Sequence, residues 1–243
     1  MSLLRQANRL LALRYRTPRL GNKRHPVSEL VFIILSARTR GENHEAIYRQ
    51  LRRHFRTWEA VRDSSFRDVQ AVIHDAGLSR VKSDQIQQLL RRLTCDFGDL
   101  SGRAFRKMST SDLEQYLTGL PGVGLKTARC VMMYSLDRDV FPVDTHCLRL
   151  FHNLGIIDGA VRFEYAQDPL QDLVPLGIRR ALHVNAVAHG REVCIPGAER
   201  CDVCPIRQLC RERRDVSRSR TGRKRNVRRV SAVRFLQPAA PRT

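Results

Sequence analysis

Between two segments of helical periodicity the chain reads Leu120-Pro121-Gly122-Val123-Gly124-Leu125-Lys126-Thr127-Ala128. Pro121-Gly122 suits the centre of a type II turn, because glycine tolerates the positive φ that the third position of this turn requires. Gly124 lets the backbone approach a partner closely, and the first N–H groups of the next helix can point at a phosphate. A plain helix–helix turn is the alternative, since short turns with glycine commonly join helices.

Lys126 falls in the first turn of that helix, where the macrodipole disfavours a cation. Partial desolvation would also lower its pKa, and a lysine with a lowered pKa is a nucleophile able to form an imine. An ordinary exposed helix lysine is the alternative. Eighteen residues later, Val143-Asp144-Thr145-His146 places a carboxylate after an apolar stretch. There Asp144 can cap the next helix, stabilise a developing cation or move a proton.

Four cysteines near the end of the chain follow the pattern Cys194-x6-Cys201-x2-Cys204-x5-Cys210. All four thiols lie within 17 residues and can reach one centre, which indicates a metal or cluster site rather than a disulfide framework. Zinc is the alternative to an iron–sulfur cluster, although the pattern holds a single close Cys-x2-Cys pair. We expect the other cysteines, Cys95, Cys130 and Cys147, to be buried and reduced.

The charge of the chain predicts a polyanionic partner. Lys and Arg number 44 against 24 Asp and Glu, which leaves a net charge of +20. Nucleic acid is the first candidate and an anionic membrane surface the second. The longest apolar run, residues 30–35, is too short to span a bilayer. Residues 211–243 hold 12 basic and two acidic side chains, a net of +10, and are expected to form a disordered basic tail.

Helical spacing of apolar residues recurs along the chain, and β-type alternation is almost absent, so the sequence predicts an all-α protein. The expected segments are residues 1–17, 43–55, 57–63, 67–76, 82–94 and 111–119, with further helices over residues 141–193. Ser28 is the expected N-cap of a helix through Val31 and Leu35. Breaks are expected at Gly155, Gly159, Pro169 and Pro175. Residues 1–17 predict a docked helix, with an organelle transit peptide as the alternative.

Taken in order and spacing, the turn with Lys126, the Val-Asp-Thr-His stretch and the four cysteines resemble endonuclease III-type DNA glycosylases. These belong to the helix-hairpin-helix–Gly/Pro–Asp superfamily, and the resemblance covers residues 25–210. It implies a monomer with two helical lobes and a DNA cleft between them. Residues 27–140 would form a helical barrel with the helix-hairpin-helix. Residues 141–210 would carry a [4Fe–4S] loop, with the helix of residues 1–26 packed against that lobe.

The resemblance also implies an activity. Lys126 would be the Schiff-base nucleophile, Asp144 the catalytic carboxylate, and Cys194, Cys201, Cys204 and Cys210 the [4Fe–4S] ligands. The protein would remove oxidised pyrimidines from duplex DNA and cut at the abasic site by β-elimination. It would act in the cytoplasm on the nucleoid, with organelle targeting left open. The residues expected to contact DNA are Leu120, Gly122, Val123, Gly124, Arg38, Leu78, His146, Arg149 and Arg191.

The chain departs from the family pattern in the segment Leu35-Ser36-Ala37-Arg38-Thr39-Arg40-Gly41. Many relatives read Leu-Ser-x-Gln-Thr-x-Asp there, and their glutamine fills the gap left by the flipped base. Arg38 can fill that gap but presents different donors to the opposite base. This leaves open a shifted specificity, for mismatches or another lesion, or a weakly catalytic DNA-binding paralogue. Leu78 falls at a second wedge position, with core packing as the alternative. Arg179-Arg180 is expected to be a solvated face.

Overall fold

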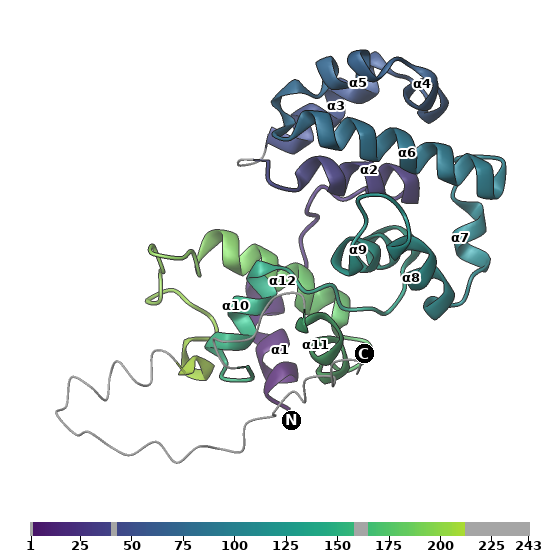
Figure 1. The fold of residues 1–243 in the computed structure, drawn as a ribbon. Coiled ribbons are helices and arrows are strands. Elements are labelled where there is room, and N and C mark those ends of the chain that lie inside the picture. Colours follow the sequence, from purple (N-terminus) through teal and green to yellow (C-terminus); the bar gives the residue numbers. More distant parts are fainter. Residues whose placement is uncertain (1, 40–42, 158–164, 212–243) are drawn as a thin grey trace, which may run out of the picture.

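The computed structural model describes residues 2–39, 43–157 and 165–211. Over these residues it contains helices and no strand, so the predicted all-α class is confirmed. Figure 1 shows two groups of helices that are joined by the chain before α2 and after α9. Each group surrounds its own hydrophobic core.

Among the described residues, the first lobe contains eight α-helices in chain order with one 3-10 turn among them. Their bounds are α2 Pro26–Ser36, α3 Asn43–His54, α4 Trp58–Asp63, α5 Phe66–Val72, η1 His74–Ala76, α6 Ser79–Phe97, α7 Arg103–Lys107, α8 Thr110–Thr118 and α9 Leu125–Leu136. Helix α1, Leu3–Tyr15, belongs to the other lobe. Helix α2 packs against α3, α6 and α9. Because α2 is buried on almost every side, its apolar run serves as the centre of this core.

The second lobe combines the first helix of the chain with the last ones. Besides α1, its helices are α10 Thr145–Asn153, α11 Gln167–Leu173, α12 Arg179–Glu192 and the 3-10 turn η3 Arg207–Leu209. Leu4, Ala7 and Leu11 of α1 belong to its core, and α1 and α10 both pack on α12. The Tyr15 hydroxyl lies 3.0 Å from His189 Nδ1. Helix α1 is therefore docked onto the C-terminal helices (Figure 1).

Two expectations about helix starts and breaks are wrong. Ser28 does not cap α2, because the helix begins at Pro26 and the His25 side chain accepts the Ser28 N–H at 3.4 Å. Proline at the first helical position has no N–H to satisfy, so it favours this earlier start. Pro169 does not break a helix either, since it lies in the first turn of α11, where its missing N–H is not needed.

Cys95 is exposed on α6, whereas Cys130 and Cys147 are buried as expected. The continuous helix expected over residues 67–76 divides into α5 and η1. The short helix α7 was not expected, and it follows Gly102, which adopts a φ of 67°. The expected break at Gly159, the role of Gly41 and the predicted disordered tail lie outside the described residues, apart from Arg211.

Candidate functional site

The predicted turn joins α8 to α9. The Val123 N–H donates to Leu120 O at 3.1 Å, and Gly122 has a φ of 75°, as a type II turn requires at this position. A Cβ atom on Gly122 would lie 2.8 Å from the Gln85 side chain, and the positive φ is strained for other residues, so the turn favours glycine here. Leu120 and Val123 are 4% and 5% exposed, which leaves their backbone, and not their side chains, to contact a partner.

Gly124 is the N-cap of α9 and has no side chain to satisfy the first N–H groups of the helix. It is exposed, and a Cβ atom there would meet no atom within 4 Å. The amino end of this 12-residue helix therefore presents free N–H groups next to open space. Such an end favours an anion, for example a phosphate.

Lys126 lies in the first turn of α9, as predicted, and is half-buried. The prediction of a lowered pKa is wrong: the Cys130 thiol, then Asp144 and Glu29, raise the pKa of Lys126 against desolvation, which lowers it. Burial raises the pKa of Cys130 itself to about 11. Below that pH the thiol is uncharged, so the carboxylates hold the lysine protonated.

Asp144 is the N-cap of α10, and its Oδ1 accepts the Cys147 N–H at 2.8 Å. Burial favours the neutral acid, but His183, the Cys147 N–H, His146 and Lys126 outweigh it and lower the pKa of Asp144. The carboxylate is therefore ionised at neutral pH and interacts with the Lys126 ammonium. The fold thus brings the two predicted catalytic groups into one electrostatic environment.

Two further ionisable groups in this environment were missed by the sequence reasoning. Glu29 is fully buried in α2, where it accepts Asn22 Nδ2 and the Lys23 N–H, each at 2.5 Å. Burial raises its pKa to about 7. His183 lies 2.8 Å from Pro142 O through Nδ1, and burial lowers its pKa to about 4. An acid directly before the apolar run of residues 30–35 was the signal available for Glu29.

Both predicted wedge residues are exposed at adjoining loops of the first lobe. Arg38 and Leu78 have φ angles of 52° and 55°. Leu78 is 53% exposed, so its alternative role in core packing is wrong. A Cβ atom on Gly77 would lie 3.2 Å from Arg38 O, which shows how closely the two loops approach.

The other expected DNA contacts differ in exposure. Arg191 is exposed at the end of α12. Arg149 is half-buried, and its Nη2 lies 3.0 Å from His146 Nδ1 and 3.2 Å from Gly190 O. A Cβ atom on Gly190 would overlap the His146 ring, so glycine is needed at this crossing. His146 and Arg149 are therefore held by the second lobe rather than projecting freely.

Arg179 and Arg180 do not form the expected solvated face. Both are half-buried and bind backbone carbonyls. Arg179 donates to Val174 O at 3.0 Å and Asp139 O at 2.8 Å. Arg180 donates to Met133 O at 2.6 Å, so it ties α12 to α9. Their charges hold loops together, a role that periodicity alone does not reveal.

The four C-terminal cysteines are half-buried in the segment from α12 to η3. Burial, together with smaller contributions from the other three thiols, raises the pKa of Cys204 to about 11. Asn153 Nδ2 donates to Cys194 Sγ at 3.3 Å, and His189 Nε2 lies 3.8 Å from Cys204 Sγ. Among the described residues no group of three or more His, Cys, Asp or Glu side chains converges closely enough for a single metal ion. Four mutually interacting thiols nevertheless match the donor set of an iron–sulfur cluster.

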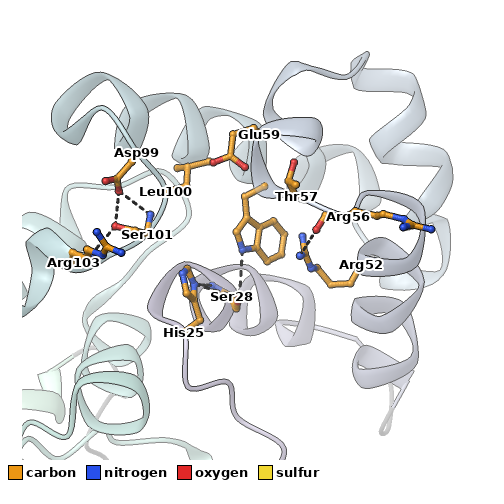
Figure 2. Close-up of a pocket in the computed structure, with 11 residues that line it drawn as sticks. His25, Ser28, Arg52, Arg56, Thr57, Glu59, Asp99, Leu100, Ser101 and Arg103 are labelled. Atoms are coloured by element: carbon orange, nitrogen blue, oxygen red, sulfur yellow. Dashed lines mark hydrogen bonds between the residues drawn. The ribbon is translucent and has the colours of Figure 1, made fainter.

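A cavity of about 650 Å³ opens elsewhere on the first lobe. Figure 2 shows it between the amino end of α2, the turn between α3 and α4, and the loop before α7. The Arg52 guanidinium lies 4.3 Å from the centre of the Trp58 ring and donates to Arg56 O at 2.6 Å. None of the predicted site residues lines this cavity, so it is separate from the Lys126–Asp144 environment.

None of the helices within residues 2–39, 43–157 and 165–211 combines the length and apolar character needed to cross a bilayer.

An all-helical fold with a glycine-rich hairpin, a lysine after it and a capping aspartate defines the class of base-excision DNA glycosylases. Residues 31–175 match the family described as HhH-GPD superfamily base excision DNA repair protein. The match extends over more than half of the chain, and the chain therefore belongs to this superfamily.

Individual relatives agree with this assignment. Endonuclease III of Thermotoga maritima is 30% identical over 195 residues, which are 80% of this chain and 87% of that protein. Protein ROS1C of Oryza sativa subsp. japonica is 29% identical over 171 residues, 63% of this chain but 9% of that longer protein. The match therefore covers most of the Thermotoga maritima protein but only a small part of the much longer rice protein.

Solved structures share the fold. A non-covalent complex of endonuclease III with DNA superimposes with a TM-score of 0.76 at 24% identity, covering 90% of this chain and 99% of the other. A thermostable thymine-DNA glycosylase gives a TM-score of 0.74 at 21% identity, covering 88% and 97%. At these identities the likeness establishes the two-lobed helical fold alone.

Proposed function

We propose that this DNA glycosylase removes oxidised pyrimidines from duplex DNA and then cuts the strand as an abasic-site lyase. One observation carries the proposal: Lys126 follows the Gly122–Gly124 turn in the first turn of α9, within the electrostatic reach of ionised Asp144. The exposed amino end of α9 would bind a backbone phosphate beside the damaged nucleotide. Duplex DNA with a damaged base or abasic site is the proposed partner, and the protein would act as a monomer on the nucleoid in the cytoplasm.

Excision requires the nucleotide to leave the helix, because C1′ is inaccessible inside a stacked duplex. The Lys126 amine forms a bond to C1′ while the glycosidic bond breaks and the base departs with the electron pair. The Asp144 carboxylate stabilises the positive charge that develops on the sugar. Its lowered pKa supports this electrostatic role rather than that of a proton donor. Lys126 must lose a proton before attack, since its pKa is raised.

Strand cleavage follows from the same lysine. Opening of the sugar ring converts the adduct to an imine, which makes a C2′ hydrogen acidic. Loss of that proton moves its electron pair toward C3′, and the C3′–O bond breaks on the 3′ side of the lesion. A primary amine at Lys126 is therefore the feature that supports lyase activity in addition to base removal.

Arg38 favours a second candidate for specificity. It is exposed and positively charged, at the position where the family resemblance implies a glutamine. A guanidinium presents donors and no acceptor, so it would discriminate among opposite bases differently from an amide. A mismatch or another lesion is therefore the alternative substrate of the same catalytic pair. A paralogue that binds damaged DNA with little catalysis is a third outcome of the experiment below.

We also propose that Cys194, Cys201, Cys204 and Cys210 hold a [4Fe–4S] cluster. The four thiols interact with one another, and the single close Cys-x2-Cys pair favours this assignment over zinc. When bound, the cluster would fix the loop between α12 and η3 as a rigid surface. Exposed Arg191 next to this loop would then be placed to contact phosphates.

Borohydride trapping tests the function directly. Wild-type protein is incubated with a duplex carrying one thymine glycol, and separately with an abasic duplex. Crosslinks to both would support glycosylase and lyase action, and Lys126→Ala should abolish them while DNA affinity remains. Lys107→Ala, at an exposed lysine of α7, is the matched control and should trap like wild type.

The remaining outcomes separate the alternatives. A crosslink to the abasic duplex alone would exclude thymine glycol as the substrate. It would favour the alternative in which Arg38 shifts the specificity to a mismatch or another lesion. If neither duplex is trapped, the catalytic proposal is wrong and the binding paralogue is the better description.

A further inference from the structure

Arg38 and Leu78 share an unusual backbone conformation. Their φ angles of 52° and 55° lie in the left-handed region, which residues other than glycine seldom occupy. Such conformations persist only where surrounding contacts impose them. Both side chains are exposed, so packing of the side chains themselves is not what imposes it. The contacts that impose the positive φ angles therefore lie beneath the two loops.

Lys82 of α6 lies beneath both loops. It is 3% exposed, and its ammonium donates to Leu35 O and Thr39 Oγ1, each at 2.8 Å, and to Ala76 O. Leu35 and Thr39 flank Arg38, and Ala76 comes two residues before Leu78. The buried Lys82 ammonium therefore binds both loops, the one that carries Arg38 and the one that carries Leu78.

The Thr39 hydroxyl completes this contact. Its oxygen lies 2.6 Å from Leu35 O and 2.7 Å from Ala76 O, so its single proton can be donated to either carbonyl. The same oxygen accepts a hydrogen bond from Lys82. Since Leu35 belongs to α2 and Ala76 to η1, the hydroxyl and the ammonium together connect segments that are far apart in sequence.

The electrostatics of Lys82 are costly for the fold. The three oxygens that it contacts are uncharged, and burial lowers its pKa to about 8. Leu35 O belongs to the last turn of α2, where the helix dipole favours a cation. A buried ammonium without a carboxylate is nevertheless rare, because desolvation is only partly offset by neutral acceptors. The contacts of this ammonium with both loops therefore fix their geometry at a cost in stability.

We propose that Lys82 is a positioning residue that holds Arg38 and Leu78 at a fixed separation, so that both can enter the duplex as the target nucleotide leaves. This inference rests on the proposed function. Two wedges from separate loops are effective only if their spacing is set before DNA binds, since ordering them on the DNA would cost binding free energy. Lys82 itself would touch neither DNA nor the reacting atoms.

Trapping rates on two DNAs test this role. Both DNAs contain the same abasic site, one in a duplex and one in a single strand. The wedges matter where a nucleotide must leave a paired stack, whereas Lys126 attack is common to both DNAs. Lys82→Met removes the donors and retains a chain of similar length. We expect its duplex rate to fall roughly tenfold to a hundredfold, while the single-strand rate stays near wild type.

Gln87→Met is the matched control. Gln87 is also 3% exposed on α6, and it donates to Val61 O at 3.1 Å and Ser64 O at 2.9 Å, away from both wedge loops. It should lose thermal stability without changing the duplex-to-single-strand ratio. If Lys82→Met fails to fold, Thr39→Val tests the same contact, because it removes the hydroxyl that Lys82 binds. This variant should also lower the ratio of the duplex rate to the single-strand rate.

The outcomes distinguish this inference from the proposed function. An unchanged ratio in Lys82→Met or Thr39→Val, or an equal loss on both DNAs, would assign Lys82 to stability alone and overturn the inference. If wild-type protein traps neither DNA, the proposed function fails and the inference fails with it.

Discussion

Asp144 Oδ1 accepts the backbone N–H of Cys147 at 2.8 Å, so the carboxylate proposed for catalysis is also the N-cap of α10. The cap fixes where the carboxylate lies relative to α9 and lowers its pKa together with nearby positive charge. Structure and charge can be separated by substitution, because asparagine caps a helix about as well as aspartate.

We predict that Asp144→Asn keeps the fold and loses base excision. The amide oxygen can still accept the Cys147 N–H, so thermal stability should change little. The negative charge near Lys126 is removed, and excision should slow on the order of 10²- to 10³-fold. Single-turnover release of thymine glycol measures the rate, and thermal unfolding is the control. A variant that excises at the wild-type rate would remove Asp144 from the mechanism.

The four-cysteine site gives a second prediction. Cys204→Ala should lose visible absorbance and iron together with solubility, because a missing ligand releases the cluster that fixes the loop. Cys95→Ala is the matched control, since Cys95 is exposed on α6 and lies outside the set. It should retain colour, iron and solubility. A colourless Cys204→Ala protein that still folds and binds DNA would show that the cluster is dispensable.

The two catalytic groups could be predicted because their signals are local. A glycine with positive φ after proline marks the turn before Lys126, and an aspartate before a helix is a typical cap. Lys82 carries no such signal, because its three partners come from segments brought together only by folding. The prediction that Cys95 is buried was wrong for the same reason. The helix that contains it was predicted correctly, but which face of α6 is exposed depends on the elements that pack against it.

Glu29 is another residue whose environment is created only by folding, and its burial leads to a third prediction. Its pKa rises from 4.5 to about 7 in the folded protein, mainly through burial. Between these pH values the folded state holds a proton that the unfolded chain has released. Stability should therefore fall as pH rises through this window and stay lower above it.

Glu29→Gln should remove this dependence, because the amide stays neutral throughout. The melting temperature of the variant relative to wild type should be more favourable above pH 7 than near pH 4.5. Glu59→Gln, at an exposed acid of α4, is the control and should show no such trend. Parallel curves for wild type and Glu29→Gln between these pH values would contradict a buried carboxyl that titrates near neutrality.

The basic C-terminal segment gives the last prediction. Residues 211–243 carry a net charge of +10, half of the +20 of the whole chain. Deleting residues 212–243 leaves every described residue in place. Each phosphate neutralised contributes about 0.9 to the slope of log affinity against log salt, so the deletion should flatten that slope and weaken binding to all sequences alike. A variant of full length with glutamine for each Arg and Lys of residues 212–243 should behave like the deletion, because charge and not length is responsible. An unchanged salt slope in either protein would show that the segment makes no phosphate contacts, and the helical lobes alone would then account for DNA binding.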